Sequence, residues 1–241
     1  MLVKTAAIVL RNTIFGDQKI IVDLFTDTLG CVSIVTRFSS SSKGKIKKQL
    51  FVPLSLIEVE IDYKENLSLQ KLKNATISVP YTSIPFDSYK LSISFFISEV
   101  TFFALRGENA NSKLFDFVFK SLLWLDQTED SCPNFHIVYM MGLVSFLGFM
   151  PNLSHYNVGD CFDLRNACFE CHPEGHSDFL DPDQAARIVS LARMNYSTMH
   201  LFKMSHNDRN VIVDVLINFY RLHIPGFPQP KSLDILKQLF V

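Results

Sequence analysis

A run of cationic side chains set among small residues offers the clearest chemistry in this chain. Between Arg37 and Lys48 the sequence places five cations around four serines and a glycine, namely Arg37, Lys43, Lys45, Lys47 and Lys48. Ammonium and guanidinium groups neutralise phosphates, and a serine- and glycine-rich backbone bends easily to follow them. Strand-like sequence lies on both sides. The pattern predicts a loop that holds a nucleic-acid backbone; a solvated hairpin tip is the alternative.

Charge is distributed unevenly along the 241 residues. Residues 1–79 carry 11 basic and 7 acidic side chains, a net charge of +4, whereas the remainder carries 12 basic and 17 acidic, a net charge of −5. The asymmetry indicates an anion-binding first part on a neutral-to-acidic body. The longest apolar stretch, near 138–150, is shorter than the roughly 18 residues that a membrane span requires, so no membrane association is expected.

A second group of candidate ligands lies around a Cys-x2-Cys pair. Two thiolates at this spacing can chelate one metal ion from a tight turn, which predicts a zinc site of Cys161, Cys168, Cys171 and His176. A second such pair is missing, so reduced, half-buried thiols explain the same residues. Five cysteines, an odd number, argue against a disulfide framework and for a reduced compartment.

Catalytic motifs are missing from the sequence. It contains no glycine-rich phosphate loop, no Gly-x-Ser-x-Gly elbow and no His-Glu-x-x-His run. Asp160 and Asp163 lie near each other, as the carboxylates of a metal-dependent nuclease do, but no third partner is evident. We expect a protein without an active site and keep the nuclease as a remote alternative.

The elements that must position the basic loop are strands. Alternating apolar residues predict strands over 2–10, 19–25, 31–37, 50–63 and 67–79, with a turn over 12–18. Five short strands within about 80 residues favour a small Greek-key barrel, the oligonucleotide-binding (OB) fold, which binds single strands in a charged groove.

Helical spacing replaces the strand period after Pro80 and Pro85. We predict helices over 86–106, 112–125, 134–149, 181–193, 209–223 and 232–240, with Asp181 as the cap of the fourth. The fold class is therefore α+β: an OB barrel over 1–79 and an α-helical bundle over 80–241, with a loop insertion at about 151–180. A groove in the bundle would suit a short apolar peptide whose carboxylates are held by arginines. Its candidates are Arg187, Arg193 and Arg221.

Several short motifs follow one another along the chain: residues 7–11 (AIVLR), 25–30 (FTDTLG), 50–56 (LFVPLSL), Glu99, 108–115 (ENANSKLF), 220–223 (YRLH) and 231–233 (KSL). In this order they resemble the RecO family of bacterial DNA repair proteins over essentially the whole chain. Each is loose alone, whereas their order and spacing together are specific.

The resemblance implies a non-enzymatic, cytoplasmic and nucleoid-associated recombination mediator. Such a protein binds single- and double-stranded DNA, anneals strands, and works with RecR and the C-terminal tail of single-strand-binding protein to help load RecA in gap repair. An RNA-binding barrel is the alternative from the residues alone. Some members hold zinc through two Cys-x2-Cys pairs; with one pair here, we expect a degenerate site and no cofactor, with zinc as the alternative. Carried over by position, the DNA contacts are Arg11, Lys19, Arg37, Lys43, Lys45, Lys47 and Lys48.

Overall fold

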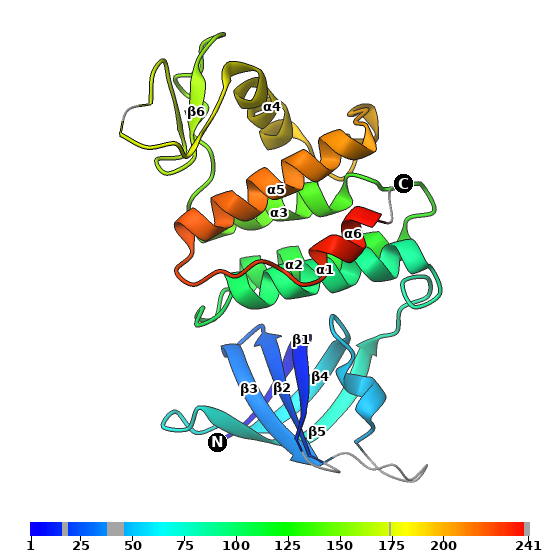
Figure 1. Cartoon of the computed structure of the whole chain (residues 1–241). Helices are drawn as coiled ribbons and strands as arrows, with labels where there is room; N and C mark the ends of the chain where they lie inside the picture. The colour runs from blue at the N-terminus through cyan, green and yellow to red at the C-terminus, as the bar shows by residue number, and fades with distance from the viewer. Residues whose placement is uncertain (16–18, 38–45, 174, 239–241) are drawn as a thin grey trace. The chain divides into compact units, whose positions relative to one another are not determined.

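The computed structural model describes residues 1–15, 19–37, 46–173 and 175–238 (Figure 1). The chain forms two compact units. Among the described residues, the first unit holds 1–128 and 230–238, and the second holds 129–229. The predicted cationic residues Lys43 and Lys45 lie outside the described residues.

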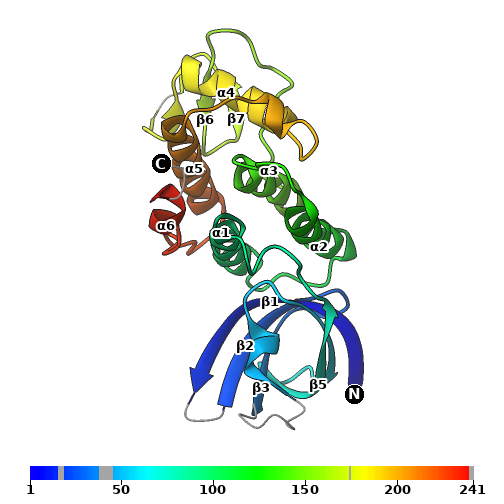
Figure 2. The same cartoon turned by 90° about the vertical axis from the view of Figure 1, so that its right-hand side faces the viewer.

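A closed five-stranded barrel opens the first unit, as Figure 2 shows. Its strand order is β1-β2-β3-β5-β4, with β3 and β5 parallel and every other pair antiparallel. The predicted OB barrel is therefore confirmed. The strands are β1 (Leu2–Phe15), β2 (Lys19–Thr26), β3 (Gly30–Arg37), β4 (Leu56–Asp62) and β5 (Leu69–Val79).

Alternating apolar side chains fill the interior of the barrel. Ile20, Val22 and Leu24 of β2 face the interior with no exposed surface, so their neighbours on that strand face outward. Phe51, also fully buried, plugs the interior from the short 3-10 helix η1 (Lys48–Phe51). Its carbonyl accepts a 2.6 Å hydrogen bond from the Asn12 amide, which ties η1 to β1.

Two sequence-based boundaries in the barrel were wrong. The turn expected over 12–18 begins too early, because β1 pairs with β2 as far as Phe15. The strand expected over 50–63 starts only at Leu56, since η1 occupies 48–51 and Leu54 takes a φ of +66° just after Pro53. A proline followed by a left-handed residue interrupts the regular ladder there, although Leu54 still donates its backbone N–H to the Val9 carbonyl at 2.6 Å.

Three helices complete the first unit: α1 (Ser88–Ala104), α2 (Ser112–Gln127) and α6 (Leu233–Gln238). The Asp87 and Asn111 side chains cap α1 and α2 by accepting backbone N–H bonds. The Ser98 hydroxyl of α1 donates to the Leu10 carbonyl of β1, joining helix and barrel. Glu99 accepts two bonds from Ser232, which holds the C-terminal segment against α1.

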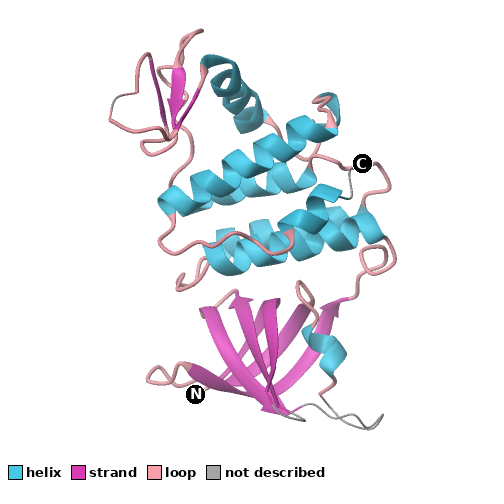
Figure 3. Cartoon of the chain, in the orientation of Figure 1, coloured by secondary structure: helices cyan, strands magenta, loops and turns pink. Residues whose placement is uncertain are grey.

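The second unit combines helices with a small sheet, both visible in Figure 3. Tyr220 of α5 donates to the Met140 carbonyl of α3, and the Asp181 side chain caps α4 as predicted. The sheet lies within the region that the sequence predicted as a loop insertion. The elements are α3 (Phe135–Leu147), β6 (Cys161–Asp163), β7 (Cys168–Glu170), β8 (Phe179–Leu180), α4 (Pro182–Arg193), the short 3-10 helix η2 (Met199–Leu201) and α5 (His206–His223).

No helix in the described parts of the chain is long and apolar enough to span a bilayer.

Candidate nucleic-acid interface

Two predicted cations stand side by side on the outer face of the barrel. Lys19 begins β2 and Arg37 ends β3, and the antiparallel register pairs them directly. Because Ile20 and Ile34 face the interior, alternation directs Lys19 and Arg37 outward, and both are exposed. Like charges opposite each other destabilise a sheet, so the pair favours a bound anion.

A groove of about 620 Å³ surrounds this pair, where β3 runs parallel to β5. Two further cations, Lys64 and Lys71, line it, and Asp62 is its only carboxylate among the described lining residues. None of the ion pairs between described residues includes any of the four cations. We call this surface the basic groove; its lining residues are Lys19, Val35, Thr36, Arg37, Asp62, Lys64, Leu67, Leu69, Lys71 and Leu72.

A buried glutamine shapes one wall of the basic groove. Gln70 is 3% exposed, and its amide Nε2 donates to the carbonyls of Lys64 and Leu67 at 3.0 and 2.5 Å. Its Oε1 accepts from the Lys64 N–H at 2.9 Å. The β4–β5 connection is therefore held by one side chain, which places Lys64 and Leu67 over the groove. Sequence reasoning missed Gln70 because an amide on a strand carries no charge or motif.

Of the other predicted DNA contacts, the three that the structure describes, Arg11, Lys47 and Lys48, do not line the basic groove. Lys47 and Lys48 are exposed at the start of η1, while Phe51 belongs to the barrel core. Arg11 stands opposite Asp23 in the β1–β2 ladder, four residues from the pairing partner of Lys19, and its guanidinium carbon lies 5.2 Å from the centre of the Phe102 ring. The structure thus joins Lys19 and Arg37 to Lys64 and Lys71, and places Arg11 against α1 instead.

The predicted zinc ligands do not come together as a metal site. Among the residues that the structure describes, no three His, Cys, Asp or Glu side chains form a group able to hold a metal ion. His176 uses both ring nitrogens, since Nδ1 accepts from the Asp178 N–H and Nε2 lies 3.3 Å from Asp163 Oδ2. Burial, followed by Glu170, raises the pKa of the Cys168 thiol to about 11, and its sulfur lies 3.4 Å from Glu170 Oε1. As placed, these residues do not fit zinc.

The paired aspartates of the same region act as turn supports. Asp160 accepts from the Asn157 N–H at 2.8 Å and from the Cys171 thiol. Asp163 accepts from the backbone N–H groups of Arg165 and Asn166. Carboxylates used in this way order the small sheet, which explains their spacing without a nuclease.

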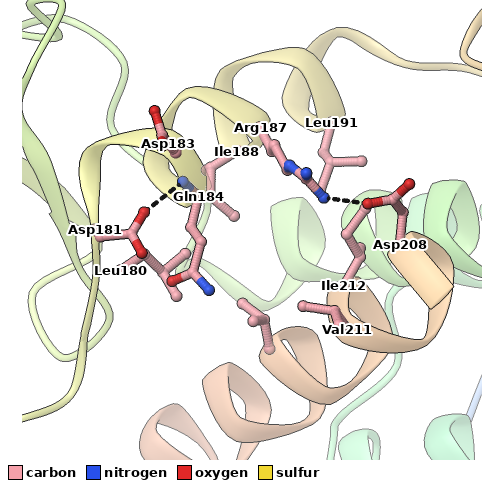
Figure 4. Close-up of a pocket in the computed structure, with 11 residues that line it drawn as sticks. Leu180, Asp181, Asp183, Gln184, Arg187, Ile188, Leu191, Asp208, Val211 and Ile212 are labelled. Carbon is pink, nitrogen blue, oxygen red and sulfur yellow. Dashed lines mark hydrogen bonds and ion pairs between the residues drawn. The ribbon is translucent and has the colours of Figure 1, made fainter. Parts of the chain in front are cut away.

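A groove in the second unit contains one of the three predicted peptide-binding arginines. Arg187 of α4 crosses to Asp208 of α5, with 2.8 Å between Nη1 and Oδ1 (Figure 4). Two hollows of about 240 and 290 Å³ share Arg187, Asp208, Leu191 and Ile212. We call them together the α4–α5 groove. Arg193 and Arg221 are exposed and line neither hollow.

The hydrogen bond that Asp208 accepts from Ser205 lowers the pKa of its carboxyl, and the bond from Arg187 lowers it further. This carboxylate therefore stays ionised. An ionised carboxylate already bound to Arg187 is the group that an incoming peptide carboxylate would have to replace. The α4–α5 groove therefore has apolar walls and one arginine, Arg187, that already binds a carboxylate.

The closed barrel and the helices that follow it in the chain define a protein with an N-terminal OB fold. The family profile described as Recombination protein O N terminal matches residues 1–81, and that described as Recombination protein O C terminal matches residues 85–233. Curated relatives named DNA repair protein RecO are 44% identical in Bacteroides fragilis, 44% in Phocaeicola vulgatus and 33% in Flavobacterium johnsoniae, over 100% of both chains in each case. The chain belongs to the RecO family, whose members act in DNA repair and recombination.

Proposed function

We propose that this chain is a recombination mediator that binds single-stranded DNA along the basic groove, binds duplexes through the same cations, and anneals complementary strands. The observation that carries this proposal is the cluster of Lys19, Arg37, Lys64 and Lys71, which face one groove with no ion pair among the described residues. Phosphate contacts of this kind position a strand without reading its sequence. The groove then supplies affinity with little base preference.

The partners follow from the same proposal. The apolar walls of the α4–α5 groove suit the apolar residues of the C-terminal tail of single-strand-binding protein. A carboxylate of that tail would have to displace Asp208 from Arg187, since Asp181 and Asp183 also line the groove and repel an acidic peptide. With RecR, the protein would help RecA replace that coat protein on gapped DNA. Its place of work would be the cytoplasm, at the nucleoid, and the chemistry would involve no catalysis by this chain.

Replacing Lys19, Arg37 and Lys71 together with alanine tests the DNA site. Each phosphate contact on a single strand contributes about 0.7 to the slope of log K against log salt, so the triple variant should lose about 2 units of slope. A matched variant with alanine at Lys4, Lys113 and Lys120, exposed cations of the first unit, removes the same charge elsewhere. Equal slopes for the two variants would refute the assignment of the groove.

The mediator role needs a separate assay. Annealing of complementary strands coated with single-strand-binding protein should be accelerated by the wild-type chain and lost in the Lys19, Arg37 and Lys71 variant. If neither protein accelerates the annealing of coated strands, the mediator proposal is rejected even if the groove binds DNA.

A further inference from the structure

A second groove lies on the outer face of the barrel, against the C-terminal half of α1. It encloses about 430 Å³ within the first unit. Strands β1, β2 and β3 form one wall, and α1 with the residues that follow it forms the other. We call it the α1 groove; its chemically distinctive lining residues are Arg11, Asp23, Ser33, Phe102, Phe103 and Arg106.

The α1 groove and the basic groove meet on the sheet. Ile21 lines the α1 groove and Val35 lines the basic groove, and the β2–β3 register pairs these two residues directly. The Lys19–Arg37 pair and the Asp23–Ser33 pair are four residues apart along the strands, a distance of about 13 Å. The outer face of β2 and β3 thus carries one path from the basic end of the barrel to α1.

The chemistry changes along this path from cations alone to cations with aromatic rings. The described residues that line the basic groove include leucine and valine but no aromatic side chain. In the α1 groove, Arg11 lies over the Phe102 ring, and the Phe102 and Phe103 rings meet edge to face with centroids 5.0 Å apart. Both rings are partly exposed. Of these two grooves, only the α1 groove therefore has described aromatic side chains on which bases can stack.

Electrostatics favour an anionic occupant of the α1 groove. No ion pair between described residues includes Arg11 or Arg106. Asp23 is the only described carboxylate of the lining, and its Oδ1 accepts a 2.5 Å hydrogen bond from the Ser33 hydroxyl. A ligand that carries both negative charge and flat rings matches two guanidinium groups beside two phenylalanines.

We propose that the α1 groove extends the single-strand path, with unpaired bases stacked on Phe102 and Phe103 and the adjoining phosphates held by Arg11 and Arg106. Continuity with the basic groove commits the site to the same strand, so this inference rests on the proposed DNA-binding function. Stacking rings accept every base, since each base has a π face. The barrel then anchors the backbone, and α1 keeps the next bases unpaired.

Strand length separates this proposal from general DNA binding. We would measure the affinity of the full chain for oligothymidylates that grow from four nucleotides to sixteen, using fluorescence anisotropy. The F102L/F103L double variant should bind the short strands as the wild type does and bind the long strands about tenfold more weakly. The F86L variant, at an exposed phenylalanine just before α1 that lines neither groove, should match the wild type at every length.

A base-specific readout excludes a purely structural effect. A 2-aminopurine placed at successive positions of the long strand should be quenched where it stacks on Phe102 or Phe103, and the quenching should vanish in F102L/F103L. Replacing that nucleotide by an abasic unit should weaken wild-type binding and leave the variant unchanged. Equal losses of affinity at all strand lengths in F102L/F103L would overturn the proposal. Long-strand affinity of that variant at the wild-type value would also overturn it, and would indicate that the Phe102 and Phe103 rings bind a peptide instead.

The same titrations keep the two proposals distinguishable. If the Lys19, Arg37 and Lys71 variant binds short strands as the wild type does, the basic groove is not the DNA site and the proposed function fails. If that variant loses short-strand binding while F102L/F103L behaves as the wild type, only the extension along α1 fails.

Discussion

Gly30, the first residue of β3, lies directly against the backbone of Glu108. A Cβ added to Gly30 would stand 2.6 Å from the Glu108 carbonyl oxygen, and the residue takes a φ of +67°. The next residue, Cys31, donates its backbone N–H to that oxygen at 3.2 Å. One glycine therefore lets the connection between α1 and α2 close onto the barrel, which fixes α1 beside the outer sheet face.

Substitution of Gly30 by alanine should destabilise the first unit by about 3 kcal/mol, because a backbone clash adds to the cost of a left-handed residue. The single tryptophan, Trp124 in α2, reports on this unit in urea unfolding. Gly107→Ala is the matched control, since Gly107 takes a φ of +86° with open space around its Cβ position. It should cost only about 1 kcal/mol. Equal losses would mean that the contact with Glu108 adjusts freely.

Gln70→Leu should weaken single-strand binding without unfolding the barrel. The leucine removes three hydrogen bonds to Lys64 and Leu67, so the β4–β5 connection no longer holds Lys64 over the basic groove. We expect a loss of about threefold in affinity and about 1 kcal/mol in stability. Gln127→Leu, at an exposed position ending α2, controls for the loss of an amide. Faster hydrogen exchange at Lys64 in Gln70→Leu would confirm the cause, whereas unchanged affinity would contradict the positioning role.

Asp126 joins the end of α2 to the segment that links the barrel with α1. Its carboxylate accepts the backbone N–H groups of Thr82, Ser83 and Ile84. Burial alone would raise the pKa of Asp126, but these bonds outweigh it and lower the pKa. A lowered pKa contributes stability that is complete above the unfolded value near 3.8 and is lost as pH falls through the folded value.

Asp126→Asn should therefore cost about 2 kcal/mol at pH 7 and less at lower pH. The stability difference from the wild type, followed by Trp124 fluorescence, should shrink as pH falls below 5 towards 2.5. Asp116→Asn, an exposed aspartate of the same helix paired only with Lys120, is the control. A difference that stays constant with pH would show that the ionised carboxylate is not the stabilising form.

Removing the guanidinium of Arg187 should weaken binding of an acidic, apolar peptide to the α4–α5 groove. We expect Arg187→Ala to reduce the affinity about tenfold, because a charge-assisted hydrogen bond to the peptide carboxylate is lost. Asp208→Asn should instead strengthen binding, since it frees Arg187 from its partner. Isothermal titration with the full chain measures both. Arg221→Ala, exposed on α5 and outside the groove, should change nothing.

The sequence predicts the strands and helices here because their periods are clean. The alternation of Ile20, Val22 and Leu24 requires a strand, and the Asp181-Pro182 pair requires a helix start. The strand boundary that was predicted wrongly depends on tertiary packing. Phe51 continues the alternating pattern of a strand, but it lies in η1 and fills the barrel interior. The strands β6, β7 and β8, of two or three residues each, are too short for any period to appear.

The candidate site was predictable only where charge is visible in the sequence. Lys19 and Arg37 meet because of a register that the strand limits already imply. Arg11 was grouped with them by its position in the family resemblance, whereas an irregularity between Val9 and Arg11 and the packing of α1 decide its surroundings. Gln70, Phe102 and Phe103 matter through contacts with residues far away in sequence, which spacing cannot reveal.

The return of the chain at Pro230 makes residues 129–229 an insertion within the first unit. Ser232 is bound to Glu99, so α1 and α6, which lie on either side of the inserted segment in the sequence, contact each other within the first unit. A gene in which codons 129–229 are replaced by a short glycine-serine linker should encode a miniature protein with the DNA-facing half intact. Such an excision would test whether the proposed strand binding and the proposed partner binding belong to separate units.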